Sequence, residues 1–345
     1  MEIQYLKRNI DKILLDWSEE RPPDRKPLLL RGARQVGKSS ALRQLSKQFK
    51  HFVEINFDEN NEDALSEAIK AASPERPLAE PIHRQLIGRL NIFLICGGMP
   101  EAVSQYVRKR DLLNGELVLN DLITVLKTDF AKYRKRTPLL LLNEVFESVM
   151  RQTEGKFVYE RAAQGTSTAT VRQALELLIM AGLVHPVTHT AANGIPLGAE
   201  KNVKYRRMIP CDTGLFLHTL GLRSEILPVA DFSAVNRGSL AEIFVGLELI
   251  KAASCYMPME LFCWQRSAGS AASRGKAQID FIIQKGSSII PIEVKSGTQG
   301  SMQSLSLFMK EKHIEKGVRT SLENFGRYGA IDIYPLYAIG NIVRG

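Results

Sequence analysis

The sequence predicts an α/β protein of two or three domains, and three observations lead to this prediction. A glycine-rich phosphate loop follows an apolar run near the N-terminus, two patterned helices precede a strand-loop-strand segment, and a β-hairpin with charged residues follows in the last third. A chain of 345 residues with 44% apolar residues can bury more than one core. We expect units at residues 1–60, 61–137, 138–211 and 212–345.

The phosphate loop is the most informative motif. Residues 32–39 read GARQVGKS, a Walker A pattern, after the apolar residues 28–30 and before a helix-like segment at 40–45. Two glycines let the backbone turn its N–H groups toward a phosphate, Lys38 reaches the terminal phosphates, and the Ser39 hydroxyl is suited to ligate Mg²⁺. The pattern predicts nucleotide binding; the alternative is a glycine turn with a solvated lysine.

The acidic half of a P-loop NTPase is missing from this sequence. Such an enzyme needs a second buried strand that ends in Asp or Glu, which holds the metal and positions water. The run 52–58 alternates like a half-exposed strand, and its Asp58 follows Lys38 closely. The apolar run 92–96 leads into glycines without an acid, and residues 60–91 read as charged helices. We therefore expect phosphate binding with doubtful hydrolysis.

The middle of the chain is patterned as a helical lid followed by a winged helix. Prolines and glycines break residues 62–130 into helices, and a new helix begins after Pro138. The next helix, which Thr168 or Thr170 is expected to cap, ends at Gly182. A strand, an irregular loop and a basic strand at 203–209 follow, which is the order of a winged helix.

Charge makes DNA the expected macromolecular partner. The 46 basic and 37 acidic residues give a net charge of +9, with basic clusters at 132–136 and 201–207. On the second helix of the winged helix, Arg172 and Gln173 are placed to contact bases or phosphates. The alternatives are that the clusters are solvated surface and that the winged helix is a spacer between proteins.

Compartment and assembly follow from what the sequence lacks. The N-terminus is unlike a signal peptide and no apolar stretch approaches membrane-spanning length, so we expect a cytoplasmic protein without a membrane partner. The four cysteines form no zinc pair and are expected to be reduced. A phosphate-loop sheet cut to two strands would expose apolar edges, which lid helices or a second copy of the chain would cover.

The last third contains a candidate nuclease site. Residues 278–284 and 289–295 read as a hairpin in which Glu293 and Lys295 share a face, with Asp280 within reach and Glu242 at the head of the preceding helix. Asp280 and Glu293 offer oxygen ligands for Mg²⁺, and Lys295 could orient water for phosphodiester cleavage. The alternative is a salt-bridged, catalytically silent cluster.

Together, four segments resemble a family of prokaryotic AAA-like ATPases that end in a restriction-endonuclease-like, PD-(D/E)xK domain of unknown function. They are LLLRGARQVGKS (28–39), GGMPEA (97–102), the winged-helix-like middle and IEVKSG (292–297). The resemblance implies a truncated P-loop domain, because the family's apolar strand ending in Asp-Glu and its sensor strand are missing here. It implies ATP contacts at Gly32, Gln35, Val36, Gly37, Lys38, Ser39 and Ser40, and a nuclease-like cluster of Glu242, Asp280, Glu293 and Lys295, with Mg²⁺ at Ser39, Asp280 and Glu293.

Overall fold

The computed structural model describes residues 9–19, 41, 44–45, 62–130, 137–153, 155–222, 237–254, 259–266, 277–298 and 300–344. The phosphate loop at 32–40, the expected strand at 52–58 and the basic cluster at 132–136 lie outside these ranges. The first described element is helix α1 (Asn9–Glu19).

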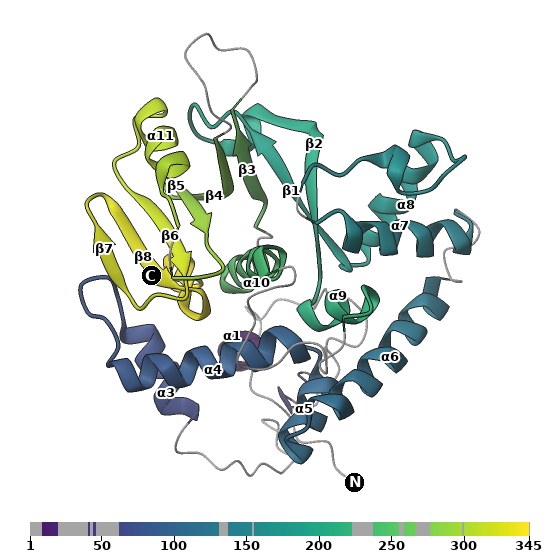
Figure 1. Ribbon diagram of the computed structural model, residues 1–345, viewed down its shortest axis with the longest axis horizontal. Coiled ribbons are helices and arrows are strands. Elements are labelled where there is room, and N and C mark those ends of the chain that lie inside the picture. The colour runs from purple at the N-terminus through teal and green to yellow at the C-terminus, as the bar shows by residue number, and fades with distance from the viewer. Residues whose placement is uncertain are drawn as a thin grey trace.

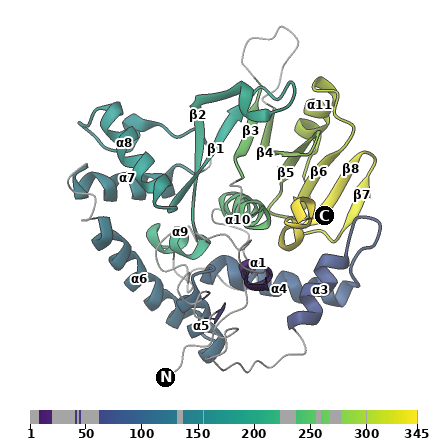
Figure 2. The same ribbon diagram turned by 180° about the vertical axis from the view of Figure 1, so that it is seen from behind.

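The segment between the phosphate loop and the middle of the chain is helical, as expected. Its helices are α3 (Glu62–Ala71), α4 (Glu80–Cys96), α5 (Pro100–Lys109) and α6 (Leu112–Asp129). They form an arc along one end of the sheet (Figures 1 and 2). Residues 62–130 contain no strand of the sheet. The apolar run 92–96 is therefore the last turn of α4 and lies within the range that the sequence assigned to helices.

The middle of the chain contains two α-helices, a hairpin of two strands, and a further, shorter α-helix. The elements are α7 (Leu139–Arg151), η2 (Tyr159–Arg161), α8 (Thr168–Met180), β1 (Val184–Thr190), η3 (Leu197–Glu200), β2 (Lys201–Pro210) and α9 (Thr213–Thr219). The cap of α8 is Ser167, whose Oγ accepts the N–H of Thr170 at 3.2 Å, and not Thr168 or Thr170 as the sequence predicted.

The C-terminal third alternates helices and strands. Its elements are α10 (Arg237–Ala252), β3 (Leu261–Gln265), β4 (Gln278–Lys285), β5 (Ser288–Val294), α11 (Gln303–Glu311), β6 (Gly317–Ser321), β7 (Gly326–Tyr328), β8 (Ile331–Pro335), η4 (Leu336–Ala338) and α12 (Asn341–Arg344). The hairpin of β4 and β5 lies where the sequence placed it, with Ile292 and Val294 directed to the same core.

One mixed sheet joins the middle and the C-terminal parts of the chain. Its order is β2-β1-β3-β4-β5-β6-β8-β7, and β1 runs parallel to β3 with Val187 opposite Leu261. Helix α10 belongs to the larger core and α11 to a second core, so the two helices cover opposite faces of the sheet. The hairpin expected for a winged helix therefore extends the sheet that carries Asp280 and Glu293.

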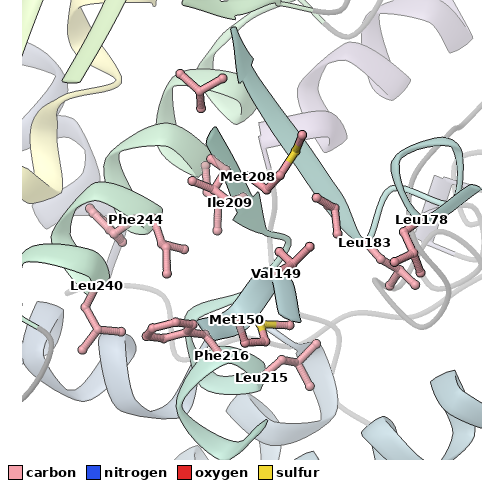
Figure 3. Close-up of a cluster of buried hydrophobic side chains, with 14 of the residues drawn as sticks. Val149, Met150, Leu178, Leu183, Met208, Ile209, Leu215, Phe216, Leu240 and Phe244 are labelled. Carbon is pink, nitrogen blue, oxygen red and sulfur yellow. The ribbon is translucent and has the colours of Figure 1, made fainter. Parts of the chain in front are cut away.

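The larger core runs across this junction (Figure 3). Val149 of α7, Leu178 of α8, Met208 of β2, Phe216 of α9 and Phe244 of α10 all contribute buried side chains to it. Burial of such side chains contributes about 1.5–3 kcal/mol each. The middle helices and the C-terminal strands thus share one packed interior.

Helices α3 and α4 also contact the C-terminal end of the chain. Asn324 donates to the Leu78 carbonyl and Asn341 to the Ile69 carbonyl, each at 2.7 Å. His83 lies 2.7 Å from the Tyr337 hydroxyl through Nδ1 and 3.2 Å from the Leu322 carbonyl through Nε2. Burial lowers the pKa of His83, which favours the neutral ring in this contact.

Two further sequence expectations concern membrane-spanning helices and the state of the cysteines. No described helix has the length and apolar character needed to cross a bilayer. Cys96, Cys211 and Cys263 are free thiols, while Cys255 lies outside the described residues.

Candidate functional site

The helix expected after the phosphate loop is present at its described residues. Ala41, Gln44 and Leu45 are helical, and Ala41 and Leu45 are buried against Leu14 of α1. The predicted nucleotide residues themselves, Gly32, Gln35, Val36, Gly37, Lys38, Ser39 and Ser40, lie outside the described residues and stay predictions.

The structure brings Asp280, Glu293 and Lys295 together at one end of the β4–β5 hairpin. Phe281 is paired with Ile292, so Asp280 and Glu293 are the next opposed residues of the two strands. The Lys295 ammonium lies 2.7 Å from Oε1 of Glu293. Oδ2 of Asp280 accepts the N–H of Val294 at 2.8 Å.

Glu293 is the most deeply placed of these carboxylates. Its side chain is 7% exposed, and its Oε2 has no hydrogen-bond partner among the described residues. Burial raises the pKa of Glu293 and the nearby Asp280 raises it further, whereas Lys295 lowers it. Burial also raises the pKa of Asp280, against the lowering effect of Arg207. The two carboxyls therefore hold protons more readily than exposed carboxyls do.

A β-bulge shapes the backbone at Asp280. Phe262 of β3 faces Ile282, whereas Trp264, two residues on, faces Ile279, so β4 carries one extra residue at this point. Bulges bend a strand and redirect its side chains and carbonyls. Arg207 of β2, the strand at the edge of the sheet, donates a hydrogen bond to the carbonyl of Asp280.

Arg207 forms an ion pair with Glu242. The Arg207 guanidinium donates to Oε2 of Glu242 at 2.5 Å and to the Asp280 carbonyl at 2.6 Å, with its side chain 1% exposed. It also lies 5.6 Å from the centre of the Phe281 ring. Although burial opposes the charged form, Glu242 raises the pKa of Arg207, which keeps the guanidinium ionised. Glu242 is thus the partner of a buried arginine.

These contacts do not fit a Mg²⁺ site. Glu242 binds Arg207, Oδ2 of Asp280 accepts a backbone N–H, and Oε1 of Glu293 binds Lys295. Within the part of the chain that the structure describes, no group of three or more His, Cys, Asp or Glu side chains could hold a metal ion. A magnesium ion favours about six oxygen ligands in near-octahedral geometry. The structure shows no such set around Asp280 and Glu293.

The basic cluster at 201–207 is largely paired with acids. Lys201 lies 2.9 Å from Glu260, and Arg206 lies 2.7 Å from Glu176. Arg207 is buried, so the sequence interpretation of the whole run as a solvent-facing phosphate contact is wrong for that residue. Strand β2 goes from exposed residues at its start to buried residues at its end, which explains the difference.

Sequence reasoning missed Asp212, which is buried at the start of α9. Its Oδ1 accepts the N–H of Leu215 at 2.9 Å and its Oδ2 accepts the N–H of Gly98 at 2.7 Å. Burial raises the pKa of Asp212, whereas the hydrogen bonds from these N–H groups lower it; the net shift is upward. The Gly97-Gly98 pair of the GGMPEA segment therefore contacts a carboxylate from the middle of the chain. The signal that could have identified Asp212 in the sequence is its position as the N-cap of α9.

Three family models match different parts of the chain. An AAA domain matches residues 24–93, and two domains of unknown function match residues 88–226 (DUF8612) and 237–339 (DUF4143). The N-terminal segment is similar to an AAA domain. This match supports an AAA-like P-loop family and nucleotide binding for residues 24–93, called the AAA-like segment below. No curated protein and no solved structure matches the chain significantly.

The matches divide the chain at elements of the fold. The AAA-like segment contains the Walker A pattern and ends within α4, where the next match begins. The third match starts with α10 and ends after η4, so it contains Glu242, Asp280, Glu293 and Lys295. The contacts of His83 in α4 with Leu322 and Tyr337, and of Leu78 before α4 with Asn324, therefore join the AAA-like segment to the C-terminal match.

Proposed function

We propose that this protein binds ATP through its AAA-like segment, holds it without efficient hydrolysis, and associates with DNA. One observation carries the nucleotide part of the proposal: the AAA match contains a complete Walker A pattern, while its described remainder at 62–93 is helical. The DNA part rests on the net charge of +9 and on the exposed basic residues of β2. Hydrolysis by P-loop NTPases depends on an acidic residue at the end of a second strand, and this remainder offers no such strand.

Each part of the loop has a role in this proposal. Backbone N–H groups of residues 32–40 would surround the phosphates, with Gly32 and Gly37 permitting the turn. Lys38 would neutralise the terminal phosphates, and the Ser39 hydroxyl would be the Mg²⁺ ligand. Gln35, Val36 and Ser40 are the remaining predicted contacts within residues 32–40.

Nucleotide binding is tested by titrating a fluorescent ATP analogue with the full chain. Wild type is expected to bind saturably, and Lys38→Ala is expected to lose binding because the terminal phosphates lose their cation. Lys12→Ala is the control, since Lys12 is an exposed lysine of α1. Equal binding by wild type and Lys38→Ala would overturn the proposal.

The carboxylate cluster of the C-terminal domain is proposed to be catalytically silent. Arg207 pairs with Glu242 and Lys295 pairs with Glu293, so two of the three carboxylates already have a cationic partner within the fold. Incubation of plasmid DNA with the purified protein and Mg²⁺ or Mn²⁺ is expected to give no nicking above that of Glu293→Ala. Nicking by wild type that this variant loses would establish the nuclease alternative.

A further inference from the structure

Two cations stacked on tyrosine rings mark a surface beside α8 and β2. The Arg172 guanidinium lies 5.4 Å from the centre of the Tyr159 ring, and the Lys156 ammonium lies 5.8 Å from that of Tyr205. We call Lys156, Tyr159, Arg172, Lys204 and Tyr205 the stacked basic surface. Its residues come from η2, the segment before it, α8 and β2, and β2 is an edge strand of the sheet. Figure 1 shows α8 beside this edge.

The segment that carries Lys156 and Tyr159 is held in place by the fold. The side chain of Gln152 accepts the N–H of Val158 at 2.9 Å and donates to its carbonyl at 3.2 Å. The N–H of Phe157 donates to the Arg206 carbonyl at 2.8 Å, and the Phe157 side chain is buried. These contacts fix the segment against β2, so its cations have a defined spacing before any partner arrives.

Both tyrosine rings already have neighbours on two sides. Tyr159 packs edge-on against Phe157 and carries Arg172, while Tyr205 packs against His189 and carries Lys156. Proteins that stack nucleic-acid bases use aromatic faces that the bases can reach. Here the rings orient cations instead, which favours contacts to phosphates over contacts to bases.

The charges facing this surface favour an anionic partner. Lys156, Arg172 and Lys204 are exposed, and so is Arg161 on η2. The acids of η2, α8 and β2 are Glu160, which accepts a hydrogen bond from Thr168 at 3.3 Å, and Glu176, which pairs with Arg206 at 2.7 Å. Among the described residues of this surface, the exposed cations therefore outnumber these acids.

The geometry points to the stacked basic surface as a site for the phosphate backbone of duplex DNA, bound without regard to base sequence. This inference rests on the proposed DNA association and names where and how the contact is made. Of the two contacts that the sequence left open for Arg172, to bases or to phosphates, it selects phosphates, because that guanidinium is stacked over Tyr159.

The test is fluorescence anisotropy with two labelled duplexes of unrelated sequence over a series of salt concentrations. Wild type is expected to bind both duplexes equally, with affinity falling linearly on logarithmic axes as salt rises. Lys156→Gln and Arg172→Gln are each expected to reduce the slope by about 0.9, the value for one phosphate contact. Arg172→Lys, which keeps the charge, is expected to keep the slope.

Lys70→Gln and Arg84→Gln are the matched controls, because each removes an exposed cation that pairs with an acid on its own helix. Both are expected to leave the slope unchanged. Equal loss in these controls, sequence preference, or equally strong binding of polyglutamate would overturn the inference while DNA binding itself persisted. No salt-dependent binding by wild type would remove the DNA association and the inference together, and leave nucleotide binding at Lys38 untouched.

Discussion

Arg207→Met is expected to lower the free energy of unfolding by about 3–5 kcal/mol, the usual cost of removing one partner of a buried ion pair. The substitution leaves Glu242 without its guanidinium and the Asp280 carbonyl without its donor. Both groups then lose a charge-assisted contact where little water reaches them. Urea denaturation followed by circular dichroism measures the change.

The neighbouring arginine provides a matched control. Arg206 also pairs with a glutamate, but its side chain is 22% exposed and that of Glu176 is 45% exposed, so Arg206→Met is expected to cost less than about 1 kcal/mol. Combining Arg207→Met with Glu242→Leu should recover much of the lost stability, because no charge then stays buried alone. Equal costs for the two single arginine variants would contradict the assigned role of Arg207.

Gly97→Ala is expected to be the second severely destabilising change. Gly97 has φ of 74° and ψ of −175°, and an added Cβ would lie 2.2 Å from Oδ1 of Asp212. That backbone region is essentially restricted to glycine and costs other residues about 1–3 kcal/mol, to which displacement of the buried carboxylate adds. The midpoint and slope of urea unfolding report the loss.

Gly88→Ala in the same helix is the control with the opposite sign. Gly88 lies inside α4 with open space around the position of an added Cβ. Alanine is about 0.8–1.0 kcal/mol more favourable than glycine within a helix, so this variant should be more stable than wild type. If Gly97→Ala were as stable as Gly88→Ala, the close approach of Asp212 to Gly97 would be wrong.

The sequence predicted the local elements of this fold well because their signals are local. Proline and glycine positions located the starts of α4 and α5, helical periodicity located α7 and α8, and alternation with the turn at 285–288 located the hairpin of β4 and β5. The run 92–96 shows the limit of such signals, because five apolar residues suit a buried helix end as well as a strand. In the structure the run belongs to α4, which packs against α6 and α9.

Long-range pairing could not be predicted from the sequence. The parallel contact between β1 and β3 joins segments separated by helices α9 and α10, and no turn signal encodes it. Arg207 became buried through this sheet, whereas its sequence neighbours Lys201 and Lys204 stayed exposed. The expectation that the basic run faces solvent therefore agrees with the structure at Lys201 and Lys204, and it is wrong at Arg207, the partner of Glu242.

In the candidate nuclease cluster too, local contacts were predicted and long-range contacts were not. The predicted proximity of Asp280, Glu293 and Lys295 follows from hairpin register and is present in the structure. The partner of Glu242 depends on β2, which the sequence assigned to another unit. Asp212 was missed because its contact with Gly98 spans more than a hundred residues.

The protein is proposed to hold ATP without turning it over. Bound ATP and released phosphate are measured in the same preparation of the 345-residue chain at saturating nucleotide and Mg²⁺, with Lys38→Ala in parallel. We expect stoichiometric binding that Lys38→Ala loses, with phosphate release no faster in wild type than in that variant. Sustained phosphate release by wild type that Lys38→Ala abolishes would show that the protein does turn ATP over.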